Sequence, residues 1–182
     1  TGTLIEVLEP GPDIQAIIDS ITDASIDKPY LIRLGPGVYD LGDANIVMKD
    51  WVSIQGSGRD VSVIKASKTG STFDVAVIVG ANNSSISDLG ILSIAPTASD
   101  QSFGIYMTGT SPNIERINIQ VNGDNLNSGV VILNASPTLH DISVTAAGIG
   151  QAEGVRAEGV STPIMTTLNI DVSNVGNCTG RL

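Results

Sequence analysis

The sequence is poor in aromatic residues, cysteine and positive charge. Aromatic residues make up 3% of its 182 residues, which leaves few rings on which a sugar could stack. Its single cysteine, Cys178, excludes an internal disulfide framework and a CxxC metal site. Nine basic against nineteen acidic residues give a formal charge of −10, so neither nucleic acid nor an anionic membrane is expected as a partner.

No apolar run in the chain approaches the roughly 18 residues that a membrane-spanning helix requires, so membrane insertion is not expected. The chain starts at Thr1 without an initiator methionine or an apolar leader, as a processed or trimmed chain does. A signal peptide removed beforehand would leave no trace, and a secreted or surface-exposed location is favoured.

β-Branched residues dominate what is present. The chain has 23 Ile and 17 Val against 12 Leu, together with 20 Gly, and 41% of it is hydrophobic. β-Branched side chains fit the pleated surface of a sheet, and glycines supply turns. This composition favours an ordered all-β domain over a helical bundle or a disordered chain.

An internal repeat occupies the second half of the chain. Four glycines begin similar segments at intervals of 25 or 26 residues: Gly104, Gly129, Gly154 and Gly180. A Ser-Pro or Thr-Pro turn and a second apolar alternation follow the first three glycines, and a degenerate earlier copy begins near Ala76. Alternation of apolar and polar residues indicates strands, so each unit holds at least two short strands.

A unit of this length has no room for a crossover helix, so successive units are expected to stack as parallel turns of a β-solenoid. A β-sandwich is the alternative, although its strands need not repeat at a fixed period. Four interior columns are predicted: Val77/Ile105/Val130/Val155, Val79/Met107/Ile132/Ala157, Leu89/Ile117/Ile142/Leu168 and Ile91/Ile119/Val144/Ile170.

The N-terminal part is expected to cover the first turn, because the exposed end of a solenoid is a raw sheet edge. Residues 13–24 are predicted to form an amphipathic capping helix, with Asp13 as N-cap and an apolar face that includes Ile14 and Ile18. Residues 1–182 then form a single β-helix domain, whose regular repeats of 25–28 residues occupy about 76–182.

Three segments occur in the order found at the opening of pectin-lyase-like β-helix proteins: IQAIIDSI at 14–21, YLIRLGPGVYDLG at 30–42 and VSIQGSGRDVSVI at 52–64. Over roughly residues 12–66 the chain resembles that superfamily and is especially similar to pectin methylesterases. The resemblance implies a right-handed parallel β-helix with an N-terminal helical cap. It does not imply esterase activity, because the Gln-Asp-Thr-Leu, Asp-Phe-Ile-Phe-Gly and Gly-Arg-Pro-Trp motifs of the esterases are missing, and Asp40 stands where they usually have Glu.

The stretch Gln-Gly-Ser-Gly-Arg at 55–59 matches neither a phosphate-binding loop nor a nucleophile elbow. No Lys-Ser or Lys-Thr pair completes the former, and the spacing of Gly56, Ser57 and Gly58 does not fit G-x-S-x-G. A tight turn between two strands is predicted there.

Stacking the repeats brings charged residues of neighbouring turns together, since equivalent positions lie about 4.8 Å apart along the coil. Glu115, Arg116, His140 and Asp141 are expected to form one charged cluster near the start of a strand. Such a cluster is a candidate acid/base site acting on a sugar acid, or else a ladder of alternating charge that avoids repulsion between turns. The ladder is the preferred interpretation, because the cluster holds the only histidine of the chain and no evident nucleophile.

Two further surface features are candidates for binding. The loop 122–127, Asn-Gly-Asp-Asn-Leu-Asn, offers oxygen ligands for calcium but matches neither the EF-hand nor the nonapeptide repeat, and no other cofactor is expected. A flat polar outer face suits an extended polysaccharide, with Tyr106 as the best outward-facing aromatic residue. Two columns build that face: Asn118/Ser143/Asn169 and Gln120/Thr145/Asp171.

The last unit ends at Gly180, Arg181 and Leu182 without a capping segment, and Arg181 breaks the apolar column. The chain is therefore expected either to be a fragment of a longer β-helix or to self-associate through this C-terminal turn. The preferred function is a non-enzymatic structural or recognition module, with polysaccharide at a surface as the expected partner. The alternatives are a polysaccharide lyase or esterase, whole or truncated, and a segment of a phage or surface fibre.

Overall fold

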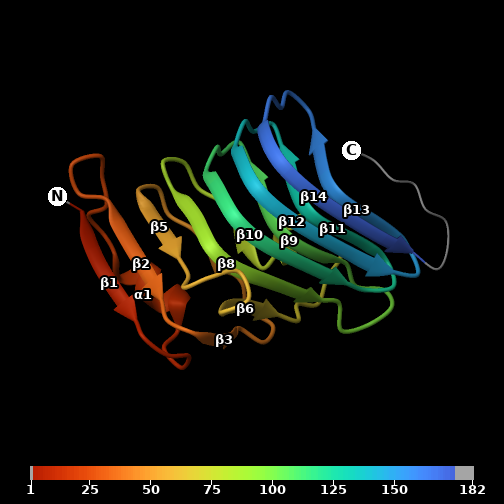
Figure 1. Cartoon of the computed structure of the whole chain (residues 1–182), viewed down its shortest axis with the longest axis horizontal. Coiled ribbons are helices and arrows are strands. Elements are labelled where there is room, and N and C mark those ends of the chain that lie inside the picture. Colours follow the sequence, from red (N-terminus) through yellow and green to blue (C-terminus); the bar gives the residue numbers. More distant parts are fainter. Residues whose placement is uncertain (1, 175–182) are drawn as a thin grey trace.

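The computed structural model describes residues 2–174, which coil into a parallel β-solenoid of about seven turns (Figure 1). We number the turns in chain order. Turn 1 is β1 (Thr3–Val7); turn 2 holds β2 (Tyr30–Leu34), β3 (Gly37–Asp40) and β4 (Ile46–Val47); turn 3 holds β5 (Val52–Gln55), β6 (Ser62–Ala66) and β7 (Ile78–Val79); turn 4 holds β8 (Ser85–Ile94) and β9 (Ser102–Thr108); turn 5 holds β10 (Asn113–Asn122) and β11 (Leu126–Leu133); turn 6 holds β12 (Thr138–Gly148) and β13 (Gln151–Glu158); turn 7 is β14 (Ile164–Asn174). The short helix α1 (Ile14–Ser20) lies between β1 and β2, and the 3-10 turn η1 (Phe73–Val75) precedes β7.

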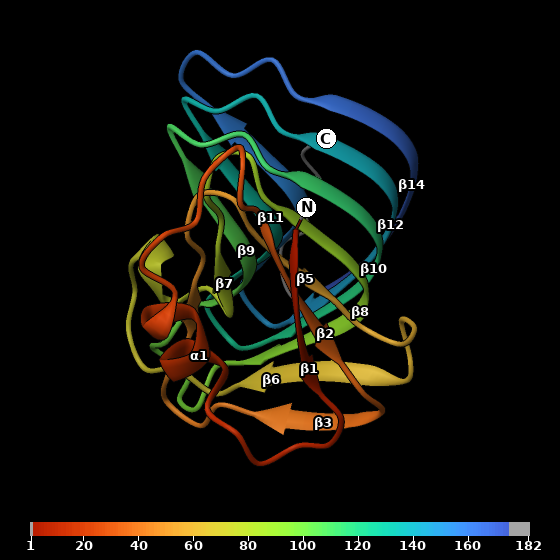
Figure 2. The ribbon, with the colours of Figure 1, turned by 90° about the vertical axis from the view of Figure 1, so that its left-hand side faces the viewer.

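The strands form two parallel sheets within residues 2–174. The larger sheet has nine strands in the order β1-β2-β5-β8-β10-β12-β14, with β3 and β6 alongside, and the smaller has five in the order β4-β7-β9-β11-β13. The end-on view shows how turns 2 to 6 bend from one sheet into the other (Figure 2). The all-β solenoid predicted from the repeat is confirmed. No helix in this part of the chain has the length and apolar character needed to cross a membrane.

In turns 4 to 7 a single long strand of the larger sheet replaces the two shorter strands of turns 2 and 3. β8 pairs with both β5 and β6, so it spans the positions that loop 56–61, the outer loop, separates in turn 3. Each long strand bends at one residue whose backbone is left-handed, with φ between 53° and 57°. These residues, the bend column, are Asp88, Arg116, Asp141 and Thr167.

The core is a stack of apolar columns that run through the turns. The two predicted columns of the larger sheet, which start at Leu89 and Ile91, are confirmed by the strand register. Burial of each such side chain favours folding by about 1.5–3 kcal/mol. One further column passes through all seven turns and contains Ile5, Ile32, Ile54, Ile86, Ile114, Leu139 and Met165.

The register predicted for the smaller sheet is wrong by one residue in turn 3. Ile78, not Val77, pairs with Ile105, so that Val79 lies opposite Tyr106. The stretch that contains these residues is apolar throughout, and a continuous apolar run has no alternation from which its register can be inferred.

Three of the glycines that begin the repeats, Gly104, Gly129 and Gly154, lie tightly against side chains of the core. A Cβ atom on Gly129 would lie 2.3 Å from Cγ1 of Val144 and 2.7 Å from the carbonyl oxygen of Gly154, so no larger residue fits there. In the second predicted column Ile132 is buried, whereas Ala157 in β13 is exposed.

Helix α1 covers the core at the N-terminal end, but it is shorter than the predicted 13–24. Its Ile18 is fully buried in the core. The helix ends where Nζ of Lys49 donates hydrogen bonds to the carbonyl oxygens of Asp19 and Ile21, at 3.1 and 3.2 Å. These bonds satisfy carbonyl groups that a further helical turn would otherwise use.

Candidate functional site

The four charged candidates lie on the outer face of the larger sheet, at the bend of turns 5 and 6. Glu115 and His140 are partners in the register of β10 and β12, and Arg116 and Asp141 follow them in the bend column. The stacking thus places the four residues at adjacent positions. Their side chains, however, divide into three separate sets of contacts.

Arg116 is held between two carboxylates. Its Nε and Nη2 atoms donate to Oδ1 and Oδ2 of Asp88 at 2.5 and 2.9 Å, and Nη2 also donates to Oε1 of Glu115 at 3.0 Å. The hydrogen bonds from Arg116 hold the pKa of Asp88 at about 2, below its ordinary value of 3.8; a bond from Gln55 adds to this effect, and burial opposes it. The same carboxylates raise the pKa of Arg116.

Asp141 is paired with a residue of turn 3. Nη2 of Arg59, in the outer loop, donates to the carbonyl oxygen of Asp141 at 2.9 Å, and the guanidinium forms an ion pair with the Asp141 carboxylate. The next residue, Asp60, accepts a hydrogen bond from Nδ2 of Asn118 at 3.1 Å. Gly90 leaves room for the outer loop, because a Cβ atom there would lie 2.5 Å from the carbonyl oxygen of Arg59. The outer loop therefore lies across turns 4 to 6.

His140 contacts a hydroxyl and not a carboxylate. Its Nδ1 atom lies 2.8 Å from Oγ1 of Thr166 in turn 7, while the Glu115 carboxylate in turn 5 is turned to Arg116. A histidine that activates a nucleophile needs a hydroxyl on one ring nitrogen and a carboxylate that orients the other. The carboxylate that could orient His140, that of Glu115, is bound to Arg116 instead.

The carboxylates of this face are poorly placed for acid catalysis on a sugar. A general acid needs a pKa raised toward the working pH, whereas the pKa of Asp88 is lowered. Glu115 and Asp141 each face an arginine. The Asp88–Arg116 pair joins turns 4 and 5 as a charge ladder would, whereas Asp141 pairs with Arg59 of turn 3 rather than with Arg116.

A groove of about 280 Å³ lies between the outer loop and the sheet. The outer loop contributes Arg59 and Asp60, and β10 contributes Asn118 and Gln120. We call it the outer groove. Its apolar lining includes Val38, Val63 and Leu92.

The polar columns predicted from the sequence start at this groove. Asn118 is in register with Ser143, and Gln120 with Thr145, so the polar strip passes from turn 5 into turn 6. It continues into turn 7 through Asn169 and Asp171. All these residues are exposed or half-buried on the outer face.

Arg59 and Asp60 are absent from the candidates derived from the sequence. The Gly-Ser-Gly-Arg-Asp stretch indicates only a turn between strands, and nothing in it reveals a contact with a residue 82 positions later in the chain. The one available signal is that turn 3 has extra residues between β5 and β6, where β8 of turn 4 is a single uninterrupted strand.

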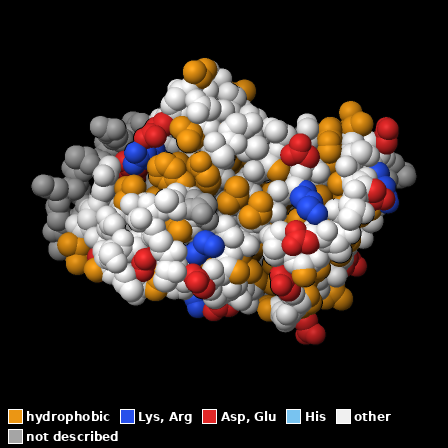
Figure 3. All heavy atoms as spheres, turned by 180° about the vertical axis from the view of Figure 1, so that it is seen from behind, with side chains coloured by type: hydrophobic (Ala, Val, Ile, Leu, Met, Phe, Trp, Pro, Cys, Tyr) orange, Lys and Arg blue, Asp and Glu red, His pale blue; other side chains and the backbone are white. Residues whose placement is uncertain are grey.

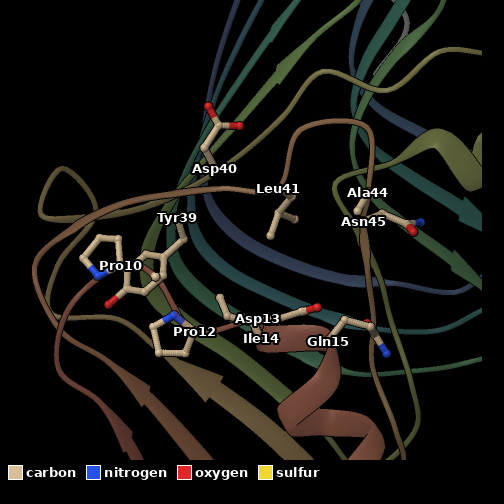
Figure 4. Close-up of a pocket in the computed structure, with 11 residues that line it drawn as sticks. Pro10, Pro12, Asp13, Ile14, Gln15, Tyr39, Asp40, Leu41, Ala44 and Asn45 are labelled. Atoms are coloured by element: carbon tan, nitrogen blue, oxygen red, sulfur yellow. The ribbon is translucent and has the colours of Figure 1, made fainter.

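A second cavity, also of about 280 Å³, lies between the N-terminus of α1 and β3 (Figure 4). Its polar groups already serve the fold. Asp13 caps the helix by accepting from the N–H of Ala16 at 3.1 Å, and Oε1 of Gln15 accepts from the N–H of Val47 at 2.7 Å. The rest of its lining includes Pro10, Pro12, Tyr39 and Leu41.

Tyr106, the aromatic residue expected to be available for a sugar, lies on the smaller sheet and not beside the outer groove. It packs on Phe73, with ring centroids 5.5 Å apart, and Phe73 also contacts the buried Phe103 at 5.3 Å. Cζ of Arg156 in turn 6 lies 5.5 Å from the centroid of the Phe73 ring. Figure 3, seen from behind, shows hydrophobic side chains gathered on that side of the molecule. The aromatic residues thus fasten η1 over the smaller sheet.

The loop predicted to offer calcium ligands uses its amides to hold neighbouring turns together. Nδ2 of Asn125 donates to the carbonyl oxygen of Ser99 in turn 4 at 2.9 Å, and Nδ2 of Asn127 donates to that of Ala147 in turn 6 at 3.2 Å. Within residues 2–174, no three His, Cys, Asp or Glu side chains gather closely enough to hold a metal ion.

Neither a family model, nor a curated protein, nor a solved structure matches the chain. The likeness to pectin-lyase-like proteins therefore rests on the sequence pattern of residues 12–66, and what the structure adds is the parallel β-solenoid itself. Cys178 and the C-terminal turn predicted to self-associate, with its Arg181, lie outside the described residues.

Proposed function

We propose that the chain is a non-enzymatic recognition module that holds an extended polysaccharide in the outer groove. The observation that carries the proposal is the groove itself, in which apolar side chains and a few polar groups line one cleft. Binding sites for small organic groups generally combine a shaped, largely apolar cleft with a small number of placed polar groups.

The polar groups of the groove suit sugar hydroxyls. A primary amide offers both donors and an acceptor, and Gln120 is exposed at the groove. The amide of Asn118 donates one hydrogen bond to Asp60, and the carbonyl oxygen of the same amide can accept one from a sugar hydroxyl. The polar strip that leads on through turns 6 and 7 would support a chain longer than the groove.

A binding role is favoured over catalysis because the charged residues nearby, apart from Asp60, already form ion pairs. Asp88 and Glu115 share Arg116, and Asp141 is held by Arg59. A retaining or inverting glycosidase needs two carboxyl groups that face the substrate, one of them protonated.

The likeness of residues 12–66 to pectin-lyase-like proteins supports polysaccharide as the ligand class. It also supports a secreted or surface-exposed location, where such polymers are found. The missing esterase motifs agree with a role that stops at binding.

The test is calorimetric titration of the protein with a panel of soluble polysaccharide fragments, neutral and acidic. We expect saturable binding to at least one of them. Gln120→Ala should weaken that binding about fivefold, as the loss of one hydrogen bond does. Thr108→Ala is the matched control, because Thr108 is exposed on the smaller sheet, and it should leave binding unchanged.

The same mixtures are assayed for new reducing ends, with calcium present. No release above a heat-treated sample is expected. Release would replace the proposal by the lyase or hydrolase alternative and direct attention to Glu115 and Asp141. A panel without any saturable binding would reject the proposal.

A further inference from the structure

We infer that the outer groove selects neutral, hydroxyl-rich oligosaccharides against uronates, and that Asp141 sets this selectivity by occupying Arg59. The inference rests on the proposed function and names its ligand class. It depends on which cations the groove presents and on what each of them already contacts.

Arg59 is the one cation that lines the groove in the described part of the chain. Its guanidinium is bound at both the carbonyl oxygen and the carboxylate of Asp141, and 30% of the side chain is exposed. Both contacts are made by Nη2, so Asp141 leaves the N–H groups of Nε and Nη1 unused, but a ligand carboxylate that approaches them also meets the negative charge of Asp141.

The other cations close to the groove are occupied in the same way. Arg116, two residues before Asn118 along β10, is shared by Asp88 and Glu115. Lys65 follows the groove residue Val63 on β6, and its Nζ lies 2.7 Å from Oδ2 of Asp40.

The carboxylates around the groove outnumber these cations. Asp60 lines the groove and bonds to an amide rather than to a cation. The charged groups on this part of the surface are Arg59, Lys65 and Arg116 against Asp40, Asp60, Asp88, Glu115 and Asp141.

A uronate would therefore meet excess negative charge, and no nearby cation whose charge is not already offset by a carboxylate. Like charges brought together at an interface oppose binding, and specificity often comes from such repulsion rather than from added attraction. A neutral sugar needs only the amides of Asn118 and Gln120 and the carboxylate of Asp60, which accepts hydrogen bonds from hydroxyl groups. The same groove with Arg59 released would offer a guanidinium suited to a carboxylate.

The experiment compares a neutral xylo-oligosaccharide with an oligogalacturonate of equal length, by calorimetry at fixed ionic strength. The proteins are the wild type, Asp141→Asn and Glu6→Gln. Asparagine tolerates the left-handed backbone of position 141, so the first variant keeps the bend. Glu6→Gln is the control, because it removes an equal charge from an ion pair of the same sheet: Glu6 in β1 pairs with Arg33 in β2, and neither residue belongs to the outer groove or the polar strip.

We expect the wild type to bind the neutral oligomer at least about tenfold more tightly than the uronate. Asp141→Asn should raise uronate affinity about tenfold, the size of one charge-assisted hydrogen bond, and leave neutral binding within about twofold. Glu6→Gln should change neither by more than about twofold.

The remaining outcomes distinguish a failure of the selectivity from a failure of glycan binding itself. Equal or tighter binding of uronate by the wild type would overturn the selectivity and leave the glycan-binding proposal intact. No gain in Asp141→Asn, or an equal gain in Glu6→Gln, would remove Asp141 from the specificity role. Failure of the wild type to bind either oligomer, or any of the wider panel, would overturn both proposals.

Discussion

At the scale of single residues, Asp88 joins the backbone bend to the electrostatics of the outer face. Its side chain is 23% exposed, and its partner Arg116 is 41% exposed. Because the folded pKa of about 2 lies below the ordinary value of 3.8, the ion pair stabilises the folded chain above about pH 4. The stabilisation is lost as the pH falls from there through 2.

Asp88→Asn is expected to lower the free energy of unfolding by about 1–2 kcal/mol at pH 7, allowing for solvent screening at Arg116. Asparagine keeps the left-handed backbone, so the change isolates the charge. Urea unfolding at several pH values measures it, and the gap between the two proteins should close as the pH approaches 2.

His140→Ala serves as the control, because this exposed side chain contacts only a hydroxyl on the same face. Its effect should stay within about 0.5 kcal/mol at every pH, as for other surface substitutions. A gap between wild type and Asp88→Asn that does not depend on pH would contradict the ion-pair account.

At the scale of the strand, the bend is set by one left-handed residue in each long strand. Asp88 and Asp141 are residue types that adopt this conformation with little strain, but Thr167 is β-branched and has φ of 55°. The left-handed region costs ordinary residues about 1–2 kcal/mol. β14 therefore carries strain that the equivalent strands of turns 4 and 6 carry to a lesser degree.

Thr167→Asn is expected to raise the free energy of unfolding by about 0.5–1 kcal/mol, because asparagine relieves part of this strain. Thr145→Asn provides the comparison: the residue lies on the same outer face in β12, where its backbone is not left-handed. There the loss of a β-branched residue from a strand should be neutral or slightly destabilising. Equal changes at the two positions in urea unfolding would count against a strained bend.

How much of the molecule could be predicted follows from this contrast between regular and irregular elements. The glycine period and the alternation at Leu89 and Ile91 predict the stacked turns and their columns, because register follows apolar alternation. The same logic fails around Val77, where every residue is apolar. The repeat alignment also predicts that Glu115 and His140 lie side by side. The contact of Asp141 with Arg59 depends on a loop whose path no local sequence pattern specifies.

At the scale of the whole molecule, turn 3 sends a segment over each face of the solenoid as far as turn 6. On the larger sheet the outer loop brings Arg59 to Asp141, and on the smaller sheet η1 brings Phe73 to Arg156. In a plain solenoid each repeat touches only its neighbours, so these contacts couple turns that would otherwise open independently.

Phe73→Ala is expected to cost about 1–3 kcal/mol, since the ring is partly buried against Phe103 and Tyr106. The substitution should also destabilise turns 5 and 6 more than turns 1 and 2. Hydrogen exchange followed by mass spectrometry should show faster exchange in β11 and β13 and little change in β1 and β2. Uniform acceleration along the chain would mean that η1 stabilises without coupling particular turns.

These two segments also restrict how the chain can change in length. One more repeat between turns 3 and 6 would carry Asp141 and Arg156 about 4.8 Å further along the axis, beyond the side chains that now meet them. One more repeat after turn 6 would disturb neither contact. Copies of a repeat thus have the same shape but are not interchangeable in position. Duplication of a repeat would be tolerated on the C-terminal side of turn 6 rather than between turns 3 and 6, where the two contacts fix the number of turns.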